Sequence, residues 1–156
     1  MTLLTSPTAT TRHRTDRLRN LPTGLALPSA VVAAVVVAAL GTTVIAGIAH
    51  GAGVSHSFSP LQPGAYVGLI VLGVLGGGIG WQLIRAKATE PARLLRTLVP
   101  VVLILSFIPD VAIGISGSDH ATWGGVIALI AAHVVVAAAA VTSFATFLPV
   151  DGSSRS

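Results

Sequence analysis

Four long apolar runs, separated by short polar segments, dominate the sequence. They cover residues 28–50, 64–84, 94–115 and 121–148. A helix needs about 20 apolar residues to cross a hydrocarbon core of about 30 Å, and each run reaches that length. Charged residues make up only 9% of the chain, against roughly 25% in soluble domains. The sequence therefore predicts an all-α, four-helix transmembrane bundle with polar tails at residues 1–27 and 149–156.

The positions of the basic residues predict how the helices are oriented. Four Lys and Arg residues fall within residues 12–19 and four within residues 85–96, out of nine in the chain. The loops at residues 51–63 and 116–120 contain none. Because Lys and Arg are retained on the cytoplasmic side, we expect both termini to be cytoplasmic, in a bacterial plasma membrane. The tail of residues 1–27 lacks apolar periodicity and is predicted to be disordered.

Two other interpretations fit parts of this charge pattern. The tail and first run could form a secretory signal cleaved near residues 44–46, but the run exceeds the roughly 7–15 residues of a signal's apolar core. The net charge of +4 could suit nucleic acid, but the basic residues flank apolar runs and no aromatic-basic platform accompanies them. The sequence thus predicts that the protein contacts the lipid bilayer and does not bind nucleic acid.

The second run contains GVLGGGIG at residues 73–80. Gly73 and Gly77 are spaced as in the G-x-x-x-G pattern, and so are Gly76 and Gly80. Such glycines let helix backbones approach closely in lipid. A phosphate-binding loop is excluded because no Lys followed by Ser or Thr comes after them. We expect these glycines to pack against a helix of this chain, of a second copy or of a membrane-protein partner.

Two further patterns concern the first and second runs. Tyr66 and Trp81 lie near the two ends of the second run, where aromatic residues form belts at membrane interfaces. Small or weakly polar residues share one face of the first run and are predicted to contact a helix: Ala39, Thr43, Ala46 and His50.

The third run contains a carboxylate, Asp110, directly after Pro109. An ionisable group costs roughly 2.5–3.5 kcal/mol at the centre of a membrane helix and by default indicates function, although Asp110 lies only about 7–8 Å from its helix end. Pro109 is expected to kink the helix and free the carbonyl of Leu105 beside Ser106. Ser106 and Asp110 share a face, which predicts a small polar patch. Three roles for Asp110 fit this patch. It could fix the register of the bundle, bind or transfer a proton or an ion, or form part of a ligand-binding site.

His133 lies near the middle of the fourth run. A structural hydrogen bond between helices is the favoured interpretation, and a proton relay or a haem ligand are the alternatives. Helix rise places His133 about 9 Å deeper than Asp110, so we expect direct contact only if a kink or tilt closes that gap. The candidate intramembrane polar site comprises Asp110, Ser106 and His133.

The sequence contains no cysteine and no familiar enzyme signature, which excludes thiolate metal sites and thiol chemistry. Imidazoles and a carboxylate near the predicted outer loops could bind zinc or copper, although no pair has a tight ligand spacing. These residues are His50, His56, Asp119 and His120. We expect a protein that is not an enzyme and has no cofactor.

A basic tail and four spans, with Ser-Phe-Ile-Pro-Asp at residues 106–110 and Ala-Ala-His-Val-Val at residues 131–135, resemble a known family. These are the small four-helix membrane proteins of actinobacteria grouped as domain of unknown function 6069. The resemblance covers residues 28–148 and implies a fold but no activity. The leading hypothesis is a structural or accessory membrane component. The rival is a small transporter or proton-coupled protein using Asp110 and His133, and an outer-face metal or haem binder is third.

Overall fold

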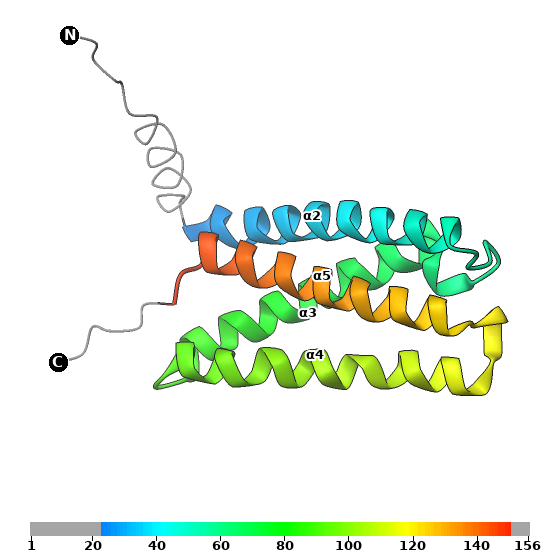
Figure 1. Cartoon of the computed structure of the whole chain (residues 1–156). Coiled ribbons are helices and arrows are strands. Elements are labelled where there is room, and N and C mark those ends of the chain that lie inside the picture. Colours follow the sequence, from blue (N-terminus) through cyan, green and yellow to red (C-terminus); the bar gives the residue numbers. More distant parts are fainter. Residues whose placement is uncertain (1–22, 151–156) are drawn as a thin grey trace, which may run out of the picture.

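The structure, a computed structural model, describes residues 23–150 and shows four long helices running alongside one another (Figure 1). They are α2 (Thr23–Gly51), α3 (Pro63–Lys87), α4 (Pro91–Ser116) and α5 (Trp123–Phe147). Two 3-10 helices, η1 (Ser59–Leu61) and η2 (Ser118–His120), lie in the connections before α3 and α5. α3 and α5 lie between α2 and α4 (Figure 1). The predicted all-α, four-helix bundle is confirmed.

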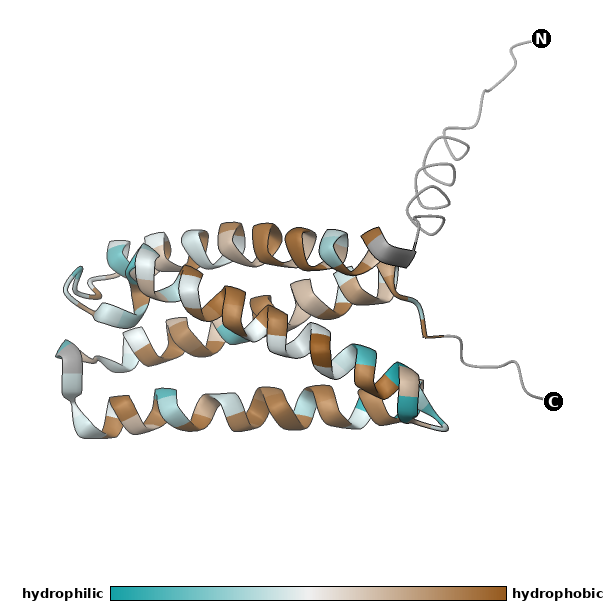
Figure 2. Cartoon of the chain, turned by 180° about the vertical axis from the view of Figure 1, so that it is seen from behind, coloured by the Kyte–Doolittle hydropathy of each residue, from teal (hydrophilic) through white to brown (hydrophobic). Residues whose placement is uncertain are grey.

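Each of these helices is long and apolar enough to cross a membrane. The shortest have 25 residues, or roughly 37 Å, against a hydrocarbon core of about 30 Å. Large apolar side chains are exposed on every helix, among them Leu40, Leu72, Leu105 and Ile127, and Figure 2 shows hydrophobic residues along much of each helix. Apolar surface of this extent requires lipid rather than water. The chain is therefore a multi-pass membrane protein.

The two ends of the bundle carry different polar residues. The basic end consists of residues 85–96 and contains Arg85, Lys87, Arg93 and Arg96. Both ends of the described chain also lie there (Figure 1). The histidine end consists of residues 50–62 and 117–122 and contains His50, His56 and His120.

Small residues bring α2 and α5 together in the most extensive helix contact of the bundle. The buried side of α2 repeats at every fourth residue: Ala26, Ala30, Ala34, Ala38, Thr42 and Ala46. A Cβ added at Gly41 would lie only 2.5 Å from Cγ1 of Val135 on α5, so the backbones are close. The stripe predicted from the sequence shares only Ala46 with this buried set. At most levels of α2, the buried residue is the one directly before the predicted residue, as with Ala38 in place of Ala39.

α2 begins at Thr23, five residues before the predicted start at Pro28. The reason is that residues 25–27 continue the apolar run, with Ala26 buried and Leu27 packed against the core. Pro28 then lies inside the helix, where it removes one backbone hydrogen bond. Residues 23–27 belong to the predicted disordered tail but are helical. The rest of that tail, residues 1–22, lies outside the described part of the chain.

Tyr66 and Trp81 lie near the two ends of α3, where aromatic belts form, but their rings are turned into the bundle and do not contribute to such belts. The Tyr66 hydroxyl is 2.9 Å from Oγ1 of Thr43. The Trp81 indole N–H donates to the carbonyl of Leu148 at 3.1 Å. Because each polar tip has a partner within the protein, the whole ring can be buried. Trp123 remains 60% exposed at the histidine end.

Candidate functional site

Asp110 faces the interior of the bundle. Of the residues of α4, only Leu95 and Asp110 are buried, and Asp110 is only 5% exposed. α4 continues as one helix through Pro100 and Pro109 (Figure 1). The carboxylate of Asp110 is therefore one of the two side chains that α4 buries.

His133 of α5 lies directly beside this carboxylate. Oδ2 of Asp110 and Nδ1 of His133 are 3.0 Å apart, so the expected separation in depth does not prevent contact. Side chains lean toward the N-terminal end of their own helix. Because α4 and α5 are antiparallel, Asp110 leans toward the basic end and His133 leans toward the histidine end. The two side chains thereby close the gap that counting backbone positions alone predicts.

The imidazole has a defined hydrogen-bonding arrangement. Nδ1 of His133 is 3.0 Å from the carbonyl oxygen of Leu129, one turn earlier in α5. A carbonyl can only accept, so Nδ1 carries the hydrogen and donates it to Leu129. Asp110 Oδ2 lies beside this N–H without a hydrogen bond of its own to the described residues. We therefore describe the pair as a close electrostatic contact, in which the carboxylate faces the positive end of the N–H dipole.

Phe107 completes the surroundings of the imidazole. Its ring lies edge-on to that of His133, with centroids 6.3 Å apart and an interplanar angle of 78°. Phe107 and Asp110 are three residues apart on α4, so both face α5 from neighbouring turns. Phe107 could not be predicted, because nothing in a single sequence shows which residues meet across helices. The Leu129 carbonyl lies one turn before His133 in the same helix, and whether the imidazole turns back to it depends on the rotamer of His133.

Ser106 lies on the same side of α4 as Asp110 but makes a separate interaction. Its hydroxyl donates to the carbonyl of Leu103 at 2.6 Å, and within the described chain no hydrogen bond joins it to Asp110. The predicted polar patch is therefore divided. Asp110 contacts His133, whereas Ser106 bonds its own helix.

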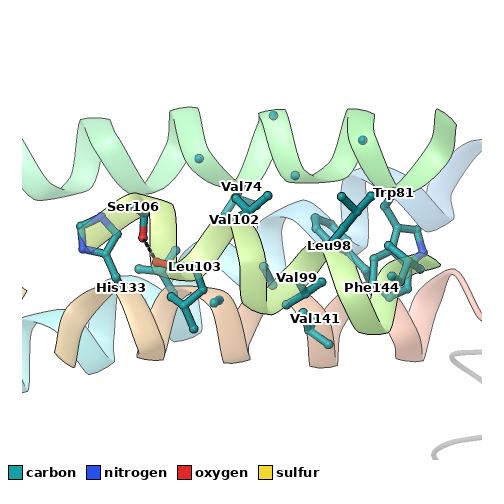
Figure 3. Close-up of a pocket in the computed structure, with 18 of the residues that line it drawn as sticks. Val74, Trp81, Leu98, Val99, Val102, Leu103, Ser106, His133, Val141 and Phe144 are labelled. Atoms are coloured by element: carbon teal, nitrogen blue, oxygen red, sulfur yellow. Dashed lines mark hydrogen bonds between the residues drawn. The ribbon is translucent and has the colours of Figure 1, made fainter. Parts of the chain in front are cut away.

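Ser106 and His133 both line a pocket of about 430 Å³ between α3, α4 and α5 (Figure 3). Its other walls are apolar side chains and the glycine side of α3. The basic-end part of the pocket includes Trp81 and Phe144, whose ring centroids are 5.7 Å apart. His133 is 37% exposed, which contrasts with the buried carboxylate of Asp110. The imidazole thus connects a buried acid with an accessible pocket.

The four glycines singled out in the sequence all line this pocket: Gly73, Gly76, Gly77 and Gly80. A Cβ added at Gly73, Gly76 or Gly80 would meet no other helix within 4 Å, and one at Gly77 would lie 3.7 Å from the Phe144 ring. The glycine that packs closely is Gly78, whose added Cβ would lie 3.3 Å from that ring. Within the described chain, the predicted glycines thus leave space open on one side of α3.

The histidine end brings together two of the four residues considered for a metal. The rings of His50 and His56 stack with centroids 4.1 Å apart, and His50 Nδ1 is 3.0 Å from the carbonyl of Val54. The side chain of Asp119 lies outside the described part of the structure. Among the side chains that are described, no three His, Asp or Glu residues form a group that could hold a metal ion.

Comparison with known proteins gives one match. The chain matches the family of unknown function DUF6069 over residues 23–149, which includes all four helices and the Asp110–His133 pair. The comparisons with curated proteins and with solved structures gave no match. Since the match covers most of the sequence, the chain belongs to the DUF6069 family.

Proposed function

We propose that this protein is a non-enzymatic membrane component, structural or accessory to a partner, in which the Asp110–His133 pair holds α4 in place. The observation that carries this proposal is the 3.0 Å contact between the two side chains. Apolar residues gain little by leaving lipid for another helix, so close packing and polar contacts hold membrane helices together. α4 has few buried residues, which makes a polar contact especially important to it.

The protein is further proposed to lie in the bacterial plasma membrane with both termini in the cytoplasm. The four basic side chains of the basic end support this orientation, because Lys and Arg near membrane helices are retained on the cytoplasmic side. The histidine end would then face outward.

Single cysteines can test this orientation, since the native chain has none. Ser57→Cys places an exposed thiol at the histidine end, and Thr89→Cys places one at the basic end. In intact cells, a membrane-impermeant maleimide should label the Ser57 variant only, and permeabilised cells should show labelling of both. Labelling of the Thr89 variant alone in intact cells would overturn the orientation.

A double-mutant cycle tests the structural role of the pair. Asp110→Ala and His133→Ala should be coupled by about 1 kcal/mol in the free energy of unfolding measured in detergent, because each removes the partner of the other. Thr142→Ala serves as the control on α5, since Thr142 is exposed and bonds the carbonyl of Ala138 in its own helix. Asp110→Ala and Thr142→Ala should add independently. Equal coupling in both cycles, or none in the first, contradicts the proposed role.

A second candidate function is proton coupling through the same pair. It is supported by a buried carboxylate oxygen that has no hydrogen bond to the described residues and lies 3.0 Å from an imidazole that is accessible from the pocket. Both groups can bind and release protons, and this distance permits direct exchange between them.

Proton flux in proteoliposomes separates the two candidates. If proton coupling is the function, the wild type dissipates an imposed pH gradient, and Asp110→Asn abolishes the flux because an amide cannot carry the proton. Glu90→Gln is the matched control, since it makes the same change on an exposed side chain at the basic end. Absence of flux in the wild type, with a less stable Asp110→Asn variant, favours the structural candidate.

A further inference from the structure

We propose that the pocket between α3, α4 and α5 binds an uncharged lipid with one apolar chain and a hydroxyl head group. Its volume of about 430 Å³ falls within the roughly 300–1,000 Å³ of ligand sites. An apolar pocket excludes water and takes up apolar molecules. From Leu95 to Ser106 along α4 it extends about 16 Å, which suits an extended chain. Val102 in its wall is 60% exposed, so a ligand can enter from the surrounding lipid.

The glycine side of α3 widens the pocket along its length, because a side chain at Gly73, Gly76 or Gly80 would occupy open space. The pocket is elongated, with about 430 Å³ over about 16 Å along α4, and this form suits one extended chain.

The polar groups of the wall point to a ligand that donates a hydrogen bond. Ser106 and His133 lie together at one end of the pocket (Figure 3). The Ser106 hydroxyl hydrogen is donated to Leu103, and the His133 Nδ1 hydrogen is donated to Leu129. With the imidazole neutral and its hydrogen on Nδ1, the lone pairs of Oγ and Nε2 remain for a ligand, and both are acceptors. A hydroxyl supplies the donor that they lack, whereas a ketone or an ether does not.

Charge and depth disfavour an ionic head group beside Ser106 and His133. The Asp110 carboxylate lies 3.0 Å from the His133 ring, so a fatty-acid carboxylate or a phosphate at this position would meet a negative group in a medium that screens little. The basic side chains lie at the basic end, away from Ser106 and His133. Ser106 is ten residues, or about 15 Å, from the end of α4 at Ser116. A phospholipid head group stays at the membrane interface and does not reach Ser106 and His133, so a phospholipid would leave both acceptors without a donor.

The test uses the full-length chain in lipid nanodiscs, with Trp123→Phe so that indole fluorescence reports Trp81 alone. Trp81 lines the pocket at the end away from His133. The probe is dodecanol brominated on its terminal carbon, because bromine quenches indole fluorescence at contact. With the hydroxyl at His133, the bromine lies near Trp81 and quenching should be saturable. The matching methyl ether should bind about tenfold more weakly, because it cannot donate a hydrogen bond.

Two glycine variants on α3 serve as a matched pair. Gly76→Leu should abolish saturable quenching, because the side chain fills the pocket. Gly68→Leu should leave it unchanged, since Gly68 is exposed, has nothing within 4 Å of an added Cβ and does not line the pocket. Absence of saturable quenching, or equal affinity for alcohol and ether, overturns the proposal. If Gly76→Leu instead dissociates an oligomer and leaves quenching unchanged, the glycine wall contacts a second copy and the proposal is wrong.

Discussion

Lipid removes the usual reason for apolar helices to associate, because an apolar side chain contacts a lipid chain as favourably as it contacts another helix. Helix positions then depend on close backbone packing and on polar groups that lipid cannot satisfy. α4 shows this dependence most clearly, since it buries only Leu95 and Asp110. The 3.0 Å contact between Asp110 and His133 joins α4 to α5. It also sets the relative positions of Ser106 and His133 at the end of the pocket.

Small residues have two different effects in this bundle. On α2, alanines at every fourth position and Gly41 let α5 approach closely, which creates the main helix contact. On α3, the glycines at positions 73, 76 and 80 meet no other helix and leave a pocket. Where a bulky partner side chain does reach α3, as Phe144 does at Gly78, the contact is close. The pocket therefore exists because α4 stands away from the glycine side of α3, while Asp110 contacts His133 on α5.

Much of the fold follows from the sequence because the length and charge of each apolar run limit it to one membrane-spanning helix. The candidate site follows only in part. Counting residues from helix ends measures the depth of the backbone, and it misses the opposite lean of side chains on antiparallel helices that brings Asp110 to His133. The burial of Tyr66 and Trp81 could not be predicted, because their partners, Thr43 and the carbonyl of Leu148, lie far away in the sequence. The glycine spacing indicated a special face of α3, but spacing alone does not distinguish a packed face from an open one.

Two features of the site can be measured: the contact between Asp110 and His133 within the membrane, and the position of the His133 hydrogen on Nδ1. Solid-state NMR of the full chain in lipid bilayers, with nitrogen-15 histidine and carbon-13 aspartate, measures both directly. We expect one protonated Nδ1 with a strong dipolar coupling to an aspartate carboxyl carbon, and we expect His133→Gln to remove that signal. A spectrum in which the His133 nitrogens show no coupling to any aspartate carboxyl carbon would contradict the account.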